Sequence, residues 1–421
     1  MHLFGGLLRN REEGDCIVKV KTIGSIISMF FNKQAFTNFY TLHKRFKENP
    51  HYKLKYLVNC SLNVIKNERI IKHEGKYIVN AFLPPINSKA FETIGVNVPG
   101  DGEDFYTNHV KGVRLAPIST YVAVTGKCMY HCWHCSASKM MEQGEADLAT
   151  KQMIYIVNEL QNLGVGIIGF TGGEPLIRQD LEEIIEAVDE RSMTLLFSNG
   201  YGLTLERAKS LKKSGLFGIA ISFDSTDAKV HDEKRGHEGA HRLALEAIKN
   251  AKEVGLYTMG QVVCTKEMLH TKEIHRVAKF LKEEGIHELR IVEPIPCGML
   301  EGEKDSILSE EEKEELINLH ILFNKDKAYP KTSVFPYVES DEQYGCGAGV
   351  QHSYVDKEGN FRPCDFIYEN YGNILEEPIT SIWEKMQKIC GGPKCGCYAK
   401  DGCKKCKQGK IPKYYRLLGG E

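Results

Sequence analysis

The sequence predicts an α/β fold with a parallel sheet or partial barrel in the middle of the chain. From about residue 116, short β-rich runs alternate with helical patterns of apolar residues. Glycines stand where the helices should end, at Gly215, Gly255 and Gly285. Strands that alternate with helices pair in parallel through right-handed crossovers, so ligands are expected at the carboxyl ends of the strands.

Six strands and the helices between them follow from this periodicity. The expected strands cover residues 119–125, 166–170, 193–197, 217–223, 257–264 and 288–292. The expected helices cover residues 148–163, 180–190, 205–213, 241–253 and 272–284. This alternation predicts a core domain over residues 116–310.

The regions on either side of the core have a different character. Residues 1–115 are predicted to form an α+β accessory region, with a helical pattern at 26–47 and strand-like runs at 68–70 and 76–82. A helix at 310–323 begins a bridging segment, residues 311–340. Residues 341–421 are rich in Gly, Cys and Pro and are predicted to form a third domain.

Length and charge exclude several classes of protein. A chain of 421 residues with 55 Lys+Arg and 56 Asp+Glu has room for two to three domains and carries almost no net charge. The balance argues against a nucleic-acid partner. The start shows no signal peptide and no run long enough to span a membrane, so we expect a cytoplasmic protein. For residues 26–40, a core helix is favoured over a helix at a membrane surface.

The 14 cysteines are unevenly placed, with three in residues 128–135 and seven in 346–406. Thiols stay reduced in the cytoplasm, where cysteine clusters usually bind metal. Cys128, Cys132 and Cys135 follow the first expected strand as C-x3-C-x2-C. Three thiolates on one loop can ligate three irons of a four-iron cluster and leave the fourth iron open. The alternative is a zinc site completed by a neighbouring histidine.

This loop resembles the signature of the radical S-adenosylmethionine (SAM) superfamily, with Trp133 as the aromatic residue before the last cysteine. The resemblance implies a partial (β/α)6 barrel and a 4Fe-4S cluster whose open iron binds SAM. It also implies cleavage of SAM to a 5′-deoxyadenosyl radical, which abstracts hydrogen from a substrate.

Further motifs at the expected strand ends resemble the SAM pocket of that superfamily. Gly172, Gly173 and Glu174 resemble its GGEP motif, whose carboxylate holds the SAM amino group. By the same resemblance, Ser222 and Asp224 are expected at the ribose. From its position alone, Arg235 is expected to pair with the SAM carboxylate. The third strand ends at two further candidate cofactor-binding residues, Ser198 and Asn199.

The C-terminal cysteines resemble the SPASM/twitch extension of the superfamily, which carries auxiliary iron–sulfur clusters. Cys346 is followed by twelve residues, Gly359, four residues and Cys364, with a β-hairpin tip expected at 355–361. The resemblance implies one or two auxiliary 4Fe-4S clusters, but the later spacing departs from the family pattern. A zinc ribbon at 395–406 is the alternative. The other candidate ligands are Cys390, Cys395, Cys397, Cys403 and Cys406.

Two other cysteines, Cys264 and Cys297, stand at or just beyond the ends of the fifth and sixth expected strands. A thiol facing the reaction chamber could return a hydrogen atom to a substrate radical. The alternative, which we favour, is a small buried hydrophobic residue.

The resemblance implies a radical SAM oxidoreductase or maturase. The substrate we expect is a peptide or protein side chain, modified by cross-linking, oxidation or epimerisation. The alternative is a tetrapyrrole or another small molecule, and the non-enzymatic alternative is an iron–sulfur or zinc scaffold protein. An electron donor such as flavodoxin or ferredoxin is expected as a partner, and membrane association is not.

Overall fold

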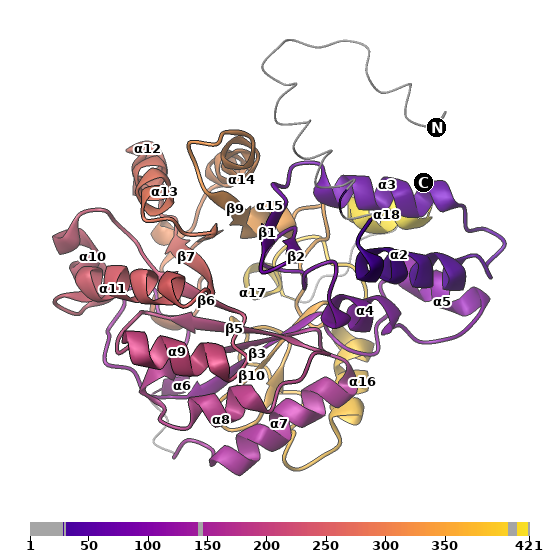
Figure 1. Cartoon of the computed structure of the whole chain (residues 1–421), viewed down its shortest axis with the longest axis horizontal. Helices are drawn as coiled ribbons and strands as arrows, with labels where there is room; N and C mark the ends of the chain where they lie inside the picture. Colours follow the sequence, from indigo (N-terminus) through magenta and orange to yellow (C-terminus); the bar gives the residue numbers. More distant parts are fainter. Residues whose placement is uncertain (1–27, 29–30, 142–145, 403–410, 420–421) are drawn as a thin grey trace, which may run out of the picture.

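The centre of the computed structural model, which describes residues 28, 31–141, 146–402 and 411–419, is a sheet of nine described strands (Figure 1). Its order is β11-β10-β3-β4-β5-β6-β7-β8-β9, and all neighbours pair in parallel except β10 and β11. The strands are β3 (Ser119–Thr125), β4 (Ile167–Gly172), β5 (Met193–Ser198), β6 (Gly218–Ser222), β7 (Tyr257–Val263), β8 (Glu288–Val292), β9 (Lys331–Val334), β10 (His352–Val355) and β11 (Phe361–Arg362).

The six predicted strands, β3 to β8, and the α/β fold class are confirmed. Helices follow the strands along the outer side of the sheet (Figure 1), and their apolar faces join those of the strands in one large core. These helices are α7 (Thr150–Leu163), α8 (Leu181–Glu186), α9 (Leu205–Lys213), α11 (Ala240–Glu253), α13 (Glu273–Glu283) and α14 (Glu310–Lys325).

Several elements of the structure were not predicted, among them α10 (Ala228–Arg235) and β9. Helix α10 has a polar sequence with little apolar periodicity, and it is stabilised by capping residues at both ends. Its N-cap Asp227 accepts from the Val230 amide, and Gly236, with φ of 59°, ends it. Strand β9 is short and is positioned by tertiary contacts. The Asn324 side-chain amide both donates to and accepts from the backbone of Thr332.

The N-terminal region closes the barrel at the amino ends of its strands. It contains α2 (Lys33–Phe46), α3 (Leu54–Ile65), the hairpin β1–β2 (Ile71–His73, Lys76–Ile78), α4 (Lys89–Val96) and α5 (Glu103–Val110). The first strand of the hairpin begins just after the run predicted at 68–70. Ile78, Ala81 and Ala90 pack against inward-facing side chains at the beginning of β4, β5 and β7, so the reaction chamber is left at the opposite, carboxyl end.

A network of buried charges joins this N-terminal region to the barrel. The Lys331 Nζ lies 3.3 Å from the Glu288 carboxylate and 3.7 Å from that of Glu68. Glu288 also accepts from the Tyr257 hydroxyl at 2.6 Å and from the Ala81 amide at 3.1 Å. Burial raises the pKa of Glu68 to about 7.

The C-terminal region packs against both the barrel and the N-terminal region. The expected hairpin between Cys346 and Cys364 is present as β10–β11, and β10 extends the barrel sheet beside β3. Helix α16 (Ile379–Cys390) contacts α7, and α18 (Lys413–Gly419) lies beside α3 and α5 (Figure 1). The Tyr106 hydroxyl donates to the Leu418 carbonyl, so the last described helix is bonded to the N-terminal region.

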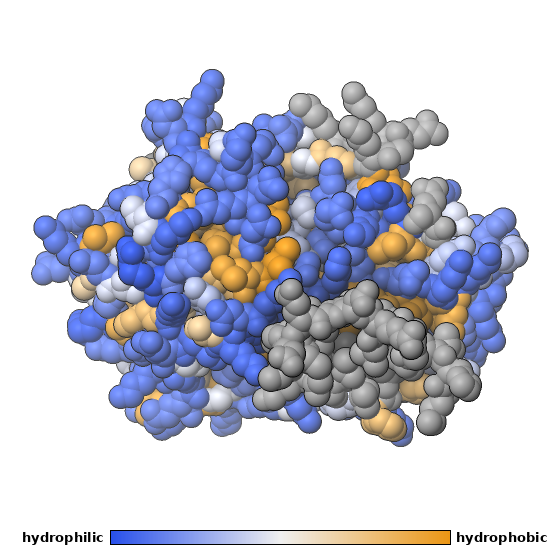
Figure 2. Space-filling view, turned by 90° about the horizontal axis from the view of Figure 1, so that it is seen from above, coloured by the Kyte–Doolittle hydropathy of each residue, from blue (hydrophilic) through white to orange (hydrophobic). Residues whose placement is uncertain are grey.

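Among the described residues, no helix is both long and apolar enough to cross a membrane. The surface in Figure 2 is mostly hydrophilic with separate apolar patches. The exposed apolar side chains of α2 and α3 are Phe36, Tyr40, Leu54, Val58 and Leu62. The segment 26–40 considered above lies partly outside the described residues.

Candidate active site

A cavity of about 220 Å³ at the carboxyl ends of the strands brings most of the predicted site residues together. The predicted residues that line it are Cys128, Cys132, Cys135, Gly172, Gly173, Glu174, Ser198, Asn199, Ser222, Arg235 and Cys297. They come from the ends of different strands, which parallel pairing carries to one edge of the sheet. Trp133, Asp224 and Cys264 are not among the lining residues.

The cysteine loop is held in place by the C-terminal end of α10. The His131 amide donates to the Arg235 carbonyl at 3.1 Å, and the Trp133 amide donates to the Lys234 carbonyl at 3.2 Å. On its other side, the Met299 amide donates to the Cys135 carbonyl at 3.0 Å. The unpredicted α10 therefore supplies the carbonyl groups that fix the shape of the loop.

The three thiols of this loop fit a soft metal centre. Burial raises the pKa of Cys128 to about 11 and also raises the pKa values of Cys132 and Cys135. Thiolates at these positions need a nearby positive charge, which bound iron would supply. Three sulfur donors from one loop, facing a shared cavity, match the chemistry of an iron–sulfur cluster.

The turn after β4 requires its two glycines. A Cβ at Gly172, where φ is +129°, would lie 2.3 Å from the Thr125 carbonyl oxygen. A Cβ at Gly173 would lie 2.0 Å from the Lys127 carbonyl oxygen. The turn therefore packs its backbone directly against the strand and loop that lead to Cys128, and no larger residue fits there.

The Glu174 carboxylate is buried and fully oriented by its neighbours. It accepts hydrogen bonds from the Ser198 hydroxyl at 2.8 Å, the Asn199 amide at 2.7 Å and the Leu176 amide at 2.9 Å. Burial nevertheless raises its pKa to about 7. A cationic ligand beside it would favour the ionised form, as expected of a site for an ammonium group.

Asp224 and Arg235, predicted to contact different parts of SAM, are paired with each other. The Arg235 Nε lies 2.7 Å from the Asp224 Oδ2, and both side chains are buried. Burial is the largest single influence and would raise the pKa of Asp224, but the Arg235 guanidinium together with His134, His231 and Lys234 lowers this pKa overall. The Arg235 Nη1 also donates to the Cys132 thiol at 3.9 Å. Arg235 therefore contacts a predicted cluster ligand as well as Asp224.

The two cysteines considered as hydrogen donors are in different surroundings. Cys297 lines the cavity, and burial raises its pKa to about 12. Cys264 is part of the hydrophobic core and is fully buried there. The structure therefore places Cys297, but not Cys264, at the chamber wall.

Other lining residues were not predicted as site residues from the sequence, among them Tyr121, Phe197, Arg290 and Asp365. Tyr121 and Phe197 looked like ordinary members of half-buried strands. Arg290 carried a usable signal, because a charged residue in the middle of a buried strand needs a partner.

Three of the C-terminal cysteines line a second cavity. Cys346, Cys364 and Cys397 share it with Glu339 and Asp365. A hydrogen bond from the Cys397 thiol lowers the pKa of Cys346 to about 6, and the same bond raises the pKa of Cys397. A thiol poised to ionise beside two other sulfur donors fits a soft metal centre.

The other C-terminal cysteines are placed differently. The Cys390 thiol lies 3.2 Å from the Tyr371 hydroxyl, at the end of α16. Cys395 is not a lining residue of the second cavity. Cys403 and Cys406 lie outside the described residues.

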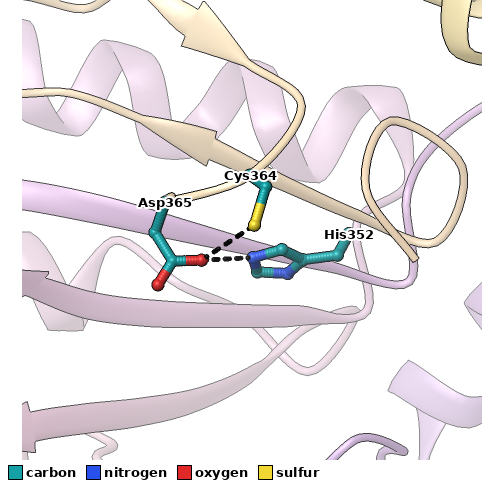
Figure 3. A group of neighbouring side chains, drawn as sticks. All are labelled: His352, Cys364 and Asp365. Carbon is teal, nitrogen blue, oxygen red and sulfur yellow. Dashed lines mark hydrogen bonds and ion pairs between the residues drawn. The ribbon is translucent and has the colours of Figure 1, made fainter. Parts of the chain in front are cut away.

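His352, Cys364 and Asp365 form a compact group beside this second cavity (Figure 3). Their candidate ligand atoms all lie within 4.8 Å of one another. The Asp365 Oδ1 lies 3.3 Å from both the His352 Nε2 and the Cys364 Sγ. Because Asp365 lines both cavities, it forms part of the wall between them.

Sequence comparison identifies a known family in the same part of the chain. Residues 122–281 match the Radical SAM superfamily. An AdoMet-dependent heme synthase of Nitratidesulfovibrio vulgaris is 26% identical over 324 residues, which cover 66% of this chain and 88% of that protein. An Fe-coproporphyrin III synthase of Methanosarcina barkeri is 25% identical over 68% of this chain and 79% of that protein.

Shorter and structural similarities point to the same fold. A PqqA peptide cyclase of Bradyrhizobium diazoefficiens is 31% identical over 37% of this chain and 41% of that protein. The crystal structure of Streptococcus suis SuiB bound to the precursor peptide SuiA covers 68% of this chain and 73% of its own, with a TM-score of 0.55 and 17% identity.

The structure of anSMEcpe with bound AdoMet covers 72% of this chain and 94% of its own, with a TM-score of 0.55 and 19% identity. The fold, the cysteine loop at the ends of its strands and the matched residues 122–281 together show that this chain is a radical SAM enzyme.

Proposed function

We propose that this enzyme modifies a carboxylate-bearing side chain of a tetrapyrrole. The observation that carries the proposal is the extent of the similarity. The heme and Fe-coproporphyrin III synthases align with 63–68% of this chain, whereas the PqqA peptide cyclases align with 37%. The similarity therefore favours the tetrapyrrole alternative over the peptide substrate expected from the sequence.

The residues of the first cavity would have separate roles in binding the cluster and in binding SAM. Cys128, Cys132 and Cys135 would hold a four-iron cluster, and SAM bound there would supply a 5′-deoxyadenosyl radical for hydrogen abstraction from the substrate. Glu174 would accept hydrogen bonds from the SAM ammonium group, in an orientation set by the Ser198 hydroxyl and the Asn199 backbone amide, which both donate to the carboxylate.

The second cavity would hold an auxiliary iron–sulfur cluster on Cys346, Cys364 and Cys397. Asp365 lines both cavities, so a cluster held there would lie beside the chamber and could accept an electron from a substrate radical. The Lys400 ammonium lies 2.6 Å from the Glu293 carboxylate, which ties the segment after Cys397 to the end of β8. This ion pair would keep the auxiliary site beside the chamber.

The test uses anaerobically reconstituted full-length enzyme with dithionite, SAM and Fe-coproporphyrin III. We expect 5′-deoxyadenosine together with a porphyrin of changed mass, both read by liquid chromatography and mass spectrometry. The matched control is the C128A/C132A/C135A variant, which should give neither product. Formation of 5′-deoxyadenosine by the wild type without any change in the porphyrin would contradict the proposed substrate but not the radical chemistry.

A further inference from the structure

A buried arginine with unused hydrogen-bonding groups lines the reaction chamber. Arg290 is in the middle of β8, and only 1% of its surface is exposed. Its guanidinium carbon lies 4.6 Å from the ring centre of Phe197, 5.3 Å from that of Phe335 and 5.5 Å from that of Phe82. The Nη2 donates to the Tyr121 hydroxyl at 3.0 Å. Aromatic faces therefore hold the cation in one place within the chamber wall.

The Nε and Nη1 groups of the Arg290 guanidinium are donors without an acceptor among the described residues. Arginine remains charged at any pH that a protein tolerates. A buried charge that is neither paired nor fully hydrogen-bonded is costly, so an anion is the partner that this position lacks.

A carboxylate on the same strand and one in the same cavity are already engaged. Glu288, two residues earlier on the same strand, accepts from the Ala81 amide and the Tyr257 hydroxyl and faces Lys331. Asp365 lines the same cavity, but its Oδ1 is within hydrogen-bond distance of both His352 and Cys364. In the described part of the chain, neither carboxylate forms a hydrogen bond or ion pair with Arg290, so the anion is best supplied by a ligand.

We propose that Arg290 binds a carboxylate of the substrate and so orients the substrate in the chamber. The inference rests on the proposed function for the kind of substrate, a tetrapyrrole with propionate side chains. The free N–H groups of Arg290 donate to the carboxylate, while Phe82, Phe197 and Phe335 keep the cation in place. The Tyr121 hydroxyl accepts one hydrogen bond from Nη2, which leaves Nε and Nη1 as the groups free to donate to the ligand.

The alternative anion in the same cavity is the carboxylate of SAM. The experiment can tell whether Arg290 binds SAM or the substrate, because SAM binding is measured in the absence of substrate. The variants are R290Q, which removes the charge, and R290K, which keeps a charge with fewer donors. R242Q is the matched control, because Arg242 is an exposed arginine that pairs with Glu246 on α11. Cluster content and melting temperature show whether each variant is folded.

The experiment compares the dissociation constants of SAM and of Fe-coproporphyrin III for the reconstituted holoenzymes. We expect R290Q to weaken porphyrin binding by about 10- to 100-fold, as for the loss of charge-assisted hydrogen bonds, with SAM binding unchanged. R290K should lie between R290Q and the wild type, and R242Q should match the wild type. The methyl ester of the porphyrin should bind the wild type as weakly as the acid binds R290Q.

Other binding results would contradict either the role of Arg290 or the tetrapyrrole substrate. Equal porphyrin binding by R290Q and the wild type would overturn the role of Arg290 and leave the tetrapyrrole proposal standing. Loss of SAM binding in R290Q would also overturn it, because Arg290 would then pair with SAM. If no porphyrin binds to the wild type, sodium propionate is the second probe. A rise in melting temperature with propionate in the wild type but not in R290Q would support the carboxylate site and reject the tetrapyrrole.

Discussion

Asp224 and Arg235 form a buried ion pair, with 2.7 Å between the Oδ2 and the Nε, directly behind the cysteine loop. Asp224 follows β6, and Arg235 is the last residue of α10, whose terminal carbonyls accept from the loop at His131 and Trp133. The pair therefore connects the sheet to the helix end that shapes the cluster site.

Replacing Asp224 by asparagine should weaken both the fold and the cluster site. The D224N variant leaves the buried Arg235 guanidinium without its counter-charge, which costs about 3–5 kcal/mol for a buried pair. We expect that loss in urea unfolding of the metal-free protein, together with less iron per chain after reconstitution. The matched control is R242Q, which breaks an exposed pair worth less than about 1 kcal/mol. Equal stability of D224N and the wild type would contradict this role.

A methyl group at Gly173 should disrupt the approach of the turn to the cysteine loop. The added Cβ of G173A would lie 2.0 Å from the Lys127 carbonyl oxygen, so the backbone on one side must move. We expect iron content and SAM binding to fall together in G173A. The G95A variant is the control, because a Cβ there meets the Leu42 side chain at an ordinary 3.5 Å. Normal iron content in G173A would show that the turn can adjust.

Replacing Glu174 by glutamine should weaken SAM binding without removing the cluster. Gln keeps the size of the side chain but loses the charge that we assign to the SAM ammonium group. We expect a rise of about 10- to 100-fold in the dissociation constant for SAM, measured by equilibrium dialysis, with unchanged iron content. The control E182Q alters a carboxylate that pairs with Arg207 on the outer helices. Unchanged SAM affinity in E174Q would remove Glu174 from the SAM site.

The auxiliary site should depend on three cysteines and not on Cys390. Cys346, Cys364 and Cys397 line one cavity, whereas the Cys390 thiol lies against Tyr371. We expect C346A, C364A and C397A each to lower iron and sulfide per chain, and C390A to leave both near the wild-type value. A fall in C390A as large as in the other three variants would assign Cys390 to the cluster.

The free energy of unfolding should depend on pH through Glu68, which lies in the buried charge network between the N-terminal region and the barrel. Its pKa is raised to about 7, so the folded state binds a proton more tightly than the unfolded chain does. The stability gained from this carboxyl is therefore fully present below the unfolded pKa and is lost as pH rises through about 7.

The E68Q variant cannot titrate at this position and provides the comparison. The free energy of unfolding of the wild type, minus that of E68Q, should fall by up to about 3 kcal/mol between pH 5 and pH 8. Urea unfolding at a series of pH values measures this difference. A difference that stays constant over this range would show that Glu68 is ionised throughout.

Local sequence was enough to predict the core of the fold. Strands β3 and β8 have the predicted bounds, and the other four predicted strands differ by one or two residues at their ends. This agreement is expected because buried apolar runs and helix-ending glycines are signals that act over short distances along the chain. The spacing of Cys128, Cys132 and Cys135 on one loop likewise predicted a cluster site without any knowledge of distant contacts.

The tertiary structure decided how those pieces meet. It paired Asp224 with Arg235, grouped Cys346 and Cys364 with Cys397 but not Cys390, and placed Arg290 in the chamber wall. Each of these relationships joins residues from separate elements. Periodicity and spacing report on neighbours along the chain, whereas contacts between distant segments depend on how the sheet, the helices and the C-terminal region pack together.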